Sequence, residues 1–68
     1  MYLIPIGEKI KQQREAVGIS RYKLSVMANL GKYAVARMEQ GNHKTHVLRA
    51  KAVCEILGCD LYDLFRES

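Results

Sequence analysis

The feature that most constrains the fold of this chain is a three-residue break at residues 29–31, between two short helical patterns. Apolar spacing and end signals predict one helix at residues 21–28, with Ser20 as its N-cap, and another at residues 32–40, closed by Gly41. A break this tight lets the first helix brace the second. The chain is therefore expected to be organised around this helix pair.

The remaining sequence predicts three more helices and no substantial sheet. Apolar residues recur at spacings of three and four, whereas the alternation typical of strands is scarce after the first few residues. We expect a helix over residues 6–17, a second from its cap at Thr45 to Gly58, and a short one capped by Asp60. The predicted fold class is all-α, a compact five-helix domain over residues 6–66 that follows an apolar N-terminal arm, residues 1–5. The alternative for this segment is a short strand, packed on its own domain or on a neighbour.

Length and charge limit the kinds of function. Sixty-eight residues form one small domain, too short for an enclosed substrate cleft with its own supporting shell. Residues 1–51 carry ten basic and three acidic side chains, whereas residues 52–68 carry one basic and four acidic side chains. A basic first three quarters favours a polyanionic partner, such as nucleic acid or an anionic membrane.

The sequence gives no sign of membrane insertion or export. No apolar run approaches the length of about twenty residues that spans a bilayer, and the first residues have neither a basic start nor a small-residue cleavage site. We therefore expect a soluble, cytosolic protein. Two cysteines are too few for a disulfide framework.

Metal binding and catalysis are disfavoured. His43, His46, Cys54 and Cys59 are zinc-ligand types, but no CxxC pair occurs, and Cys54 falls on the apolar stripe of its predicted helix, with Ala50, Val53 and Leu57. Nucleophilic catalysis would need Ser or Cys beside a base and an orienting group, whereas both histidines lie in or next to the basic loop. The chain also contains no glycine-rich phosphate-loop motif. We expect no metal, no cofactor and no enzymatic activity.

The predicted helix at residues 32–40 has an outward face suited to reading DNA. Val35, Met38 and Glu39 share one side. The opposite side, with Lys32 at its start, holds Tyr33, Ala36, Arg37 and Gln40. In the major groove Arg can bond bidentately to guanine and Gln to adenine, while a small Ala permits close approach. The alternative is an ordinary solvated helix face.

Residues 19–41 (ISRYKLSVMANLGKYAVARMEQG) resemble the helix-turn-helix of the phage repressor and Cro-type family. Residues 6–15 and 56–65 are similar to the first and the closing helices of that family, so the resemblance covers nearly the whole chain from Ile6 to Phe65. It implies a lambda-repressor-like fold with the helix-turn-helix proper at residues 20–41.

The resemblance also implies roles for individual residues. It assigns base reading to Lys32, Tyr33 and Arg37, to which the outward face adds Ala36 and Gln40. Contacts with phosphates are implied for Arg21, Asn42, His43 and Lys44. Gly31 stands where the family usually has Ser or Thr as a cap, which leaves the first N–H groups of the helix free for a phosphate.

Two other positions depart from the family. Ser25 stands where the family usually has Ala, and Asn29 where it usually has Gly. Ser is small enough to keep the helices close, and Asn enters the left-handed backbone region readily, so we expect the turn to form.

A charge on the inner stripe of the first predicted helix needs a partner. That stripe reads Ile6, Ile10, Arg14 and Val17, and Glu39 lies on the inward side of the helix at residues 32–40. Burying either charge alone would be costly, and the resemblance matches the two residues to a pair. We predict a partly buried ion pair between Arg14 and Glu39; the alternative is two independent exposed charges.

The function predicted from these residues is sequence-specific regulation of transcription by binding double-stranded DNA, with repression as the expected outcome. Because half-sites are normally read by symmetric dimers, we expect a homodimer through the apolar residues 1–6 or 61–65; the alternative is that both segments close the monomer core. An antitoxin that autoregulates its operon and a protein-interaction adaptor on the same scaffold are the alternative functions.

Overall fold

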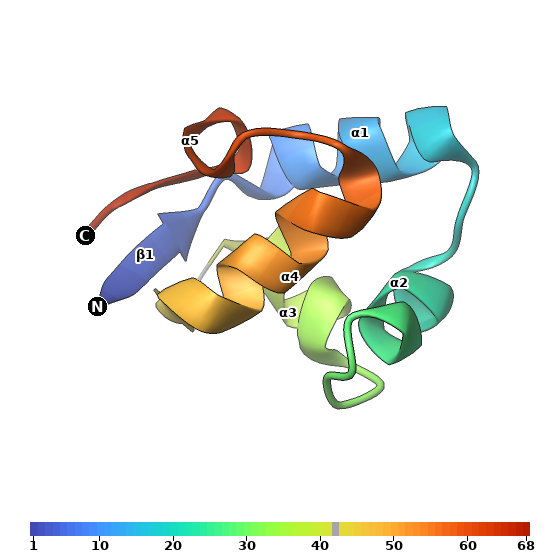
Figure 1. Ribbon diagram of the computed structural model, residues 1–68, viewed down its shortest axis with the longest axis horizontal. Helices are drawn as coiled ribbons and strands as arrows, with labels where there is room; N and C mark the ends of the chain where they lie inside the picture. The colour runs from blue at the N-terminus through green and yellow to red at the C-terminus, as the bar shows by residue number, and fades with distance from the viewer. Residues whose placement is uncertain (42) are drawn as a thin grey trace.

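Five helices and a small antiparallel sheet make up the computed structural model, which describes residues 1–41 and 43–68. The helices are α1 (Gly7–Val17), α2 (Arg21–Met27), α3 (Ala34–Gln40), α4 (Val47–Leu57) and α5 (Leu61–Leu64), and the strands are β1 (Tyr2–Pro5), β2 (Thr45–His46) and β3 (Phe65–Glu67). In Figure 1, α1 runs along one side, α4 crosses in front, and α2 and α3 lie on the side opposite α1. The sheet and both termini lie at one end.

The three-stranded sheet corrects the prediction of an all-α fold. Its order is β2-β1-β3, and both pairings are antiparallel, with Leu3 opposite Thr45 on one side and opposite Glu67 on the other. Strands of two to four residues are too short to show alternation in the sequence, and each lies in a different part of the chain. The N-terminal segment, for which an arm or a short strand was expected, contains β1, the central strand of the chain's own sheet.

The core is built from the sheet and all five helices. Phe65, Leu3, Ile10, Leu24 and Val53 are fully excluded from solvent. The α4 residues that share the predicted apolar stripe are all buried: Ala50, Val53, Cys54 and Leu57. Val17, predicted on the inner stripe of α1, is instead 46% exposed, at the last residue of the helix.

The start of α4 also differs from the prediction. Thr45 is not its cap, because this residue is drawn into β2 opposite Leu3. His46 takes the N-cap position, and its Nδ1 accepts a hydrogen bond of 3.1 Å from the Leu48 N–H. Asp60 is the N-cap of α5, as predicted, and its N–H donates to the Asp63 carboxylate at 3.2 Å.

Among the described residues, no helix combines the length and the apolar character that crossing a bilayer requires.

Candidate nucleic-acid interface

The turn between α2 and α3 depends on one non-glycine residue in the left-handed region. Asn29 has φ 60°. Asn tolerates this conformation better than most residues, so the turn forms although Gly is absent. The Leu30 N–H then donates to the Ser25 carbonyl at 2.9 Å, which holds the turn against the end of α2.

Helix α3 begins two residues later than predicted, at Ala34 and not at Lys32. The Ala34 N–H donates to the Gly31 carbonyl at 2.9 Å, and the next free N–H, that of Val35, donates to the Ser25 hydroxyl at 3.1 Å. The first turn is therefore closed by a short-range bond and by a neighbouring helix. Lys32 and Tyr33 consequently lie in the turn that leads into α3.

The buried and the exposed residues of α3 lie on the two sides that the helical spacing predicts. Val35 and Met38 are buried, whereas Arg37 and Gln40 are exposed and Ala36 is half-buried between them. In the preceding turn, Tyr33 is 61% exposed, and the Lys32 Nζ lies 5.3 Å from the centre of its ring. This contact is a cation–π interaction that keeps the ammonium group beside the aromatic ring.

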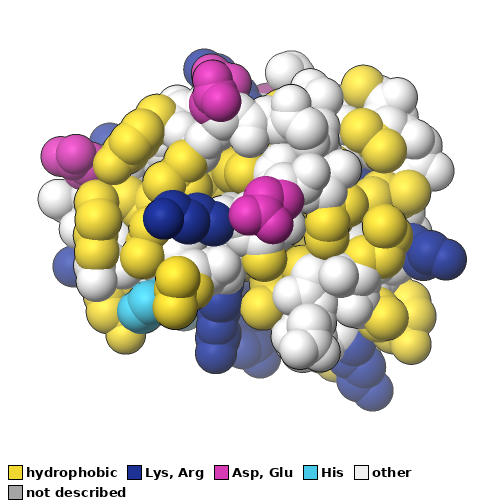
Figure 2. Space-filling model, viewed as in Figure 1, with side chains coloured by type: hydrophobic (Ala, Val, Ile, Leu, Met, Phe, Trp, Pro, Cys, Tyr) yellow, Lys and Arg dark blue, Asp and Glu magenta, His cyan; other side chains and the backbone are white. Residues whose placement is uncertain are grey.

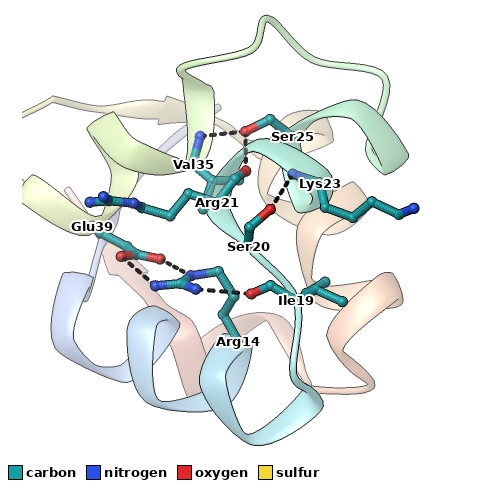
Figure 3. Close-up of polar contacts among 8 residues, drawn as sticks. All are labelled: Arg14, Ile19, Ser20, Arg21, Lys23, Ser25, Val35 and Glu39. Atoms are coloured by element: carbon teal, nitrogen blue, oxygen red, sulfur yellow. Dashed lines mark hydrogen bonds and ion pairs between the residues drawn. The ribbon is translucent and has the colours of Figure 1, made fainter.

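Helix α3 is anchored to α1 by an ion pair (Figure 3). The Arg14 Nε donates to Glu39 Oε2 at 2.6 Å, and a second guanidinium nitrogen donates to Glu39 Oε1 at 3.3 Å. A third bond, of 2.9 Å, goes from Arg14 to the Ile19 carbonyl just before α2. The side chains of Arg14 and Glu39 are only 11% and 7% exposed, and hydrogen bonding to Glu39 raises the pKa of Arg14. One guanidinium therefore connects α1, the start of α2 and α3.

A groove of about 560 Å³ lies beside the exposed face of α3. It brings together six residues predicted to contact DNA: Gly31, Lys32, Tyr33, Arg37, His43 and Lys44. The groove is also lined by six residues that were not predicted to contact DNA: Tyr2, Ala34, Met38, Thr45, His46 and Arg49. No acidic side chain is among the described residues that line it, so the groove concentrates positive charge.

The sequence held only a weak signal for the residues that were missed. Arg49 is a basic residue one turn into a helix, and no sequence pattern shows that this helix starts beside α3. Its position follows from β2, which pairs with β1 and thereby also brings His46 against Tyr2, with ring centres 5.2 Å apart. The pairing of β2 with β1, which was not predicted from the sequence, thus places Arg49 in the groove.

The other predicted contact residues lie on the opposite flank of α3. Arg21, Ala36 and Gln40 line a smaller depression of about 400 Å³. Its other lining residues are Lys11, the Arg14–Glu39 ion pair and the acidic residues Glu8 and Glu15. Asn42, predicted to contact a phosphate, lies outside the described residues. The structure therefore brings the predicted residues into two sets, one on each side of the α3 outward face.

Figure 2 shows basic side chains gathered along the edge of the molecule below α4, the edge at which α2 and α3 lie in Figure 1. This arrangement suits a long, negatively charged ligand such as a nucleic-acid backbone.

The cysteines offer no activated thiol. Burial raises the pKa of the Cys54 thiol to about 11 and also raises the pKa of Cys59, and both effects favour the unreactive protonated form. Among the residues that the structure describes, no group of three or more His, Cys, Asp or Glu side chains is placed to hold a metal ion.

Comparison with known proteins gives the same helix-turn-helix arrangement as the structure. The family model described as helix-turn-helix matches residues 10–64. Among solved structures, the chain is similar to the restriction-modification controller protein C.AhdI from Aeromonas hydrophila, with a TM-score of 0.78 and 22% sequence identity over 87% of this chain and 89% of that one. At this identity the likeness concerns the fold. No curated protein matches the sequence.

Proposed function

Because the chain belongs to the Cro/C1-type helix-turn-helix family of DNA-binding transcription regulators, we propose that it represses transcription by occupying a specific double-stranded DNA site with α3 in the major groove. The domain that does so spans residues 6–66, with the helix-turn-helix proper at residues 20–41. The observation that carries this proposal is the exposed, acid-free groove beside a helix that is anchored from behind by Arg14.

The two sets of residues beside α3 have different roles in this proposal. Base edges are read by the side chains on the outward face of α3 and in the turn before it: Lys32, Tyr33, Ala36, Arg37 and Gln40. Phosphates are contacted by residues on both flanks: Arg21, Gly31, Asn42, His43 and Lys44. Phosphate contacts fix the register of the protein on the duplex, whereas base contacts give the sequence preference. The exposure of Arg37 and Gln40 on α3 and the position of Lys44 in the acid-free groove support these assignments.

We also propose that the protein acts as a homodimer. Part of the two apolar segments first considered for an interface is used within the monomer, since Leu3, Leu64 and Phe65 are buried in its own core. Met1, Tyr2 and Tyr62 of those segments are 63%, 54% and 55% exposed, so they remain available for a partner copy. A monomer at high concentration in sedimentation equilibrium would remove this part of the proposal.

The test compares two single substitutions on specific and random duplexes. Arg37→Ala should weaken binding to the selected sequence by about 1–3 kcal/mol and relax the preference at one base pair. Lys44→Ala should weaken binding to all sequences alike and reduce the salt dependence. Equal losses on both duplexes for Arg37→Ala would contradict base reading by this residue. Weak binding by wild type, indifferent to sequence, would instead favour the adaptor function.

A further inference from the structure

Ser25 is a polar side chain with no solvent exposure, and its hydroxyl makes two hydrogen bonds. The Oγ donates to the Arg21 carbonyl at 2.8 Å within α2 and accepts from the Val35 N–H of α3 at 3.1 Å. Figure 3 shows the hydroxyl between these two backbone groups. A single side chain of α2 therefore holds the first turn of α3.

The bond from Val35 changes where α3 can begin. In an uninterrupted α-helix the Val35 N–H would donate to the carbonyl four residues earlier, that of Gly31. Here the Gly31 carbonyl accepts from Ala34 instead, which is the shorter spacing of a 3₁₀ turn. Tyr33, at the N-cap position of α3, provides no side-chain cap. The Ser25 hydroxyl thus supplies, from a neighbouring helix, the acceptor that the turn itself lacks.

This arrangement separates the proposed base-reading residues into two groups. Arg37 and Gln40 project from regular helix, whereas Lys32 and Tyr33 project from the turn that the Ser25 bond keeps out of the helix. We propose that Ser25 is a positioning residue that sets where Lys32 and Tyr33 lie relative to Arg37, and that it thereby determines the base preference at one end of the DNA site. This inference rests on the proposed function, since it assumes that α3 reads bases.

The Ser25→Ala substitution should change how α3 begins. Ala fits the same space but offers no acceptor, and a buried N–H without a partner is costly. The Gly31 carbonyl is the nearest backbone alternative for Val35, so α3 should extend toward Lys32 and move both turn side chains. The consequence is a changed base preference and not a uniform loss of binding.

The experiment is selection from a random duplex pool with wild type and four variants. Ser25→Ala should alter the preference at the same base positions as Lys32→Ala, with the ratio of Kd values for the two preferred sequences shifting about tenfold. Base positions whose preference changes in Arg37→Ala should keep the wild-type preference in Ser25→Ala. Val53→Ala, which removes fully buried atoms from α4, is the control for lost stability and should keep the wild-type preference.

The outcomes separate this inference from the function on which it rests. If wild type selects no sequence, the proposed function is wrong. If wild type selects a sequence and Ser25→Ala selects the same one, or changes only the Arg37 positions, the function stands and the positioning role is overturned. Should Ser25→Ala fail to fold, Ser25→Cys takes its place, because sulfur is a poor acceptor in a similar volume. Wild-type preference in that variant would equally overturn the inference.

Discussion

Gly7, the first residue of α1, lies against the backbone of Glu39 near the end of α3. A Cβ added at Gly7 would overlap the Glu39 carbonyl, whereas one added at Gly31 would meet no heavy atom within 4 Å. The absence of a side chain at Gly7 thus sets how closely α1 approaches α3. The sequence contained no sign of this, because the contact depends on a residue 32 positions away.

Gly7→Ala should therefore destabilise the protein by about 1–3 kcal/mol, since neither backbone can yield without moving a helix. The same substitution at Gly31 is the matched control and should change the free energy of unfolding by less than about 0.5 kcal/mol. Urea unfolding of both variants measures the difference. Equal stabilities for the two would show that α1 does not pack this closely.

The Arg14–Glu39 pair makes a second prediction at this scale. Each single Ala substitution leaves the other charge largely buried and should cost about 3 kcal/mol of folding free energy. The double variant should lose less than the sum, with a coupling of about 1–3 kcal/mol. Lys51→Ala combined with Glu39→Ala is the control and should be additive within about 0.5 kcal/mol. Additive losses for Arg14 and Glu39 would mean that their contact contributes nothing.

Cys54 gives the stability of the protein a dependence on alkaline pH. Burial raises the pKa of this thiol from 9.0 to about 11, so the unfolded chain releases the proton at a lower pH than the folded one. The stabilising contribution is complete below about pH 9 and is lost as the pH rises through about 11, to a total of about 3 kcal/mol. In Cys54→Ala the fall in unfolding free energy between these values should be smaller by that amount, whereas Cys59→Ala should keep most of it. Parallel curves for wild type and Cys54→Ala would refute this prediction.

At the scale of elements, the sequence predicts what depends on neighbouring residues. All five helices are present, and Gly18, Gly41 and Gly58 follow α1, α3 and α4 with positive φ, because periodicity and end signals are local. The errors in the sheet and in the start of α3 have a different origin. The sheet joins three distant segments, and the late start of α3 depends on a hydroxyl in α2, so both are tertiary effects.

The candidate site, like the fold, was predictable where it depends on neighbouring residues. The outward face of α3 follows from helical spacing, and the Arg14–Glu39 contact joins the inward sides of two predicted helices. Arg49 could not be placed, because its position in the groove depends on the pairing of β2 with β1. Local patterns therefore predicted the part of the surface that lies on one helix, and they missed the part that distant strands assemble.

Arg49 provides the prediction for the groove. If the groove follows a DNA backbone, Arg49→Ala should lower the slope of log Kobs against log salt concentration by about 0.9, the value of one phosphate contact. Lys51→Ala removes the same charge from the same helix at an exposed position that does not line the groove, and it should leave the slope nearly unchanged. Equal effects of the two substitutions would mean that only the net charge of the protein matters.

On the scale of the whole molecule, basic and acidic residues are unevenly divided along the chain. Most basic residues precede position 52, in the part that holds α1, α2, α3 and the start of α4, and most acidic residues after that position are in α4, α5 and β3. Val35 anchors α3 in the core without lining the groove, so most of the groove surface can be polar without loss of packing. A small domain can thus combine a rigid core with a binding face.

The most direct test of the account is an NMR titration of the ¹⁵N-labelled protein with a duplex selected by wild type. We predict that the largest shift changes fall on the start of α2, on residues 31–40 and on the groove residues of β2 and α4, and that a shuffled duplex produces smaller changes at the α3 face. Changes centred on α1 and α5, or identical changes with both duplexes, would contradict the claim that α3 and its groove read DNA.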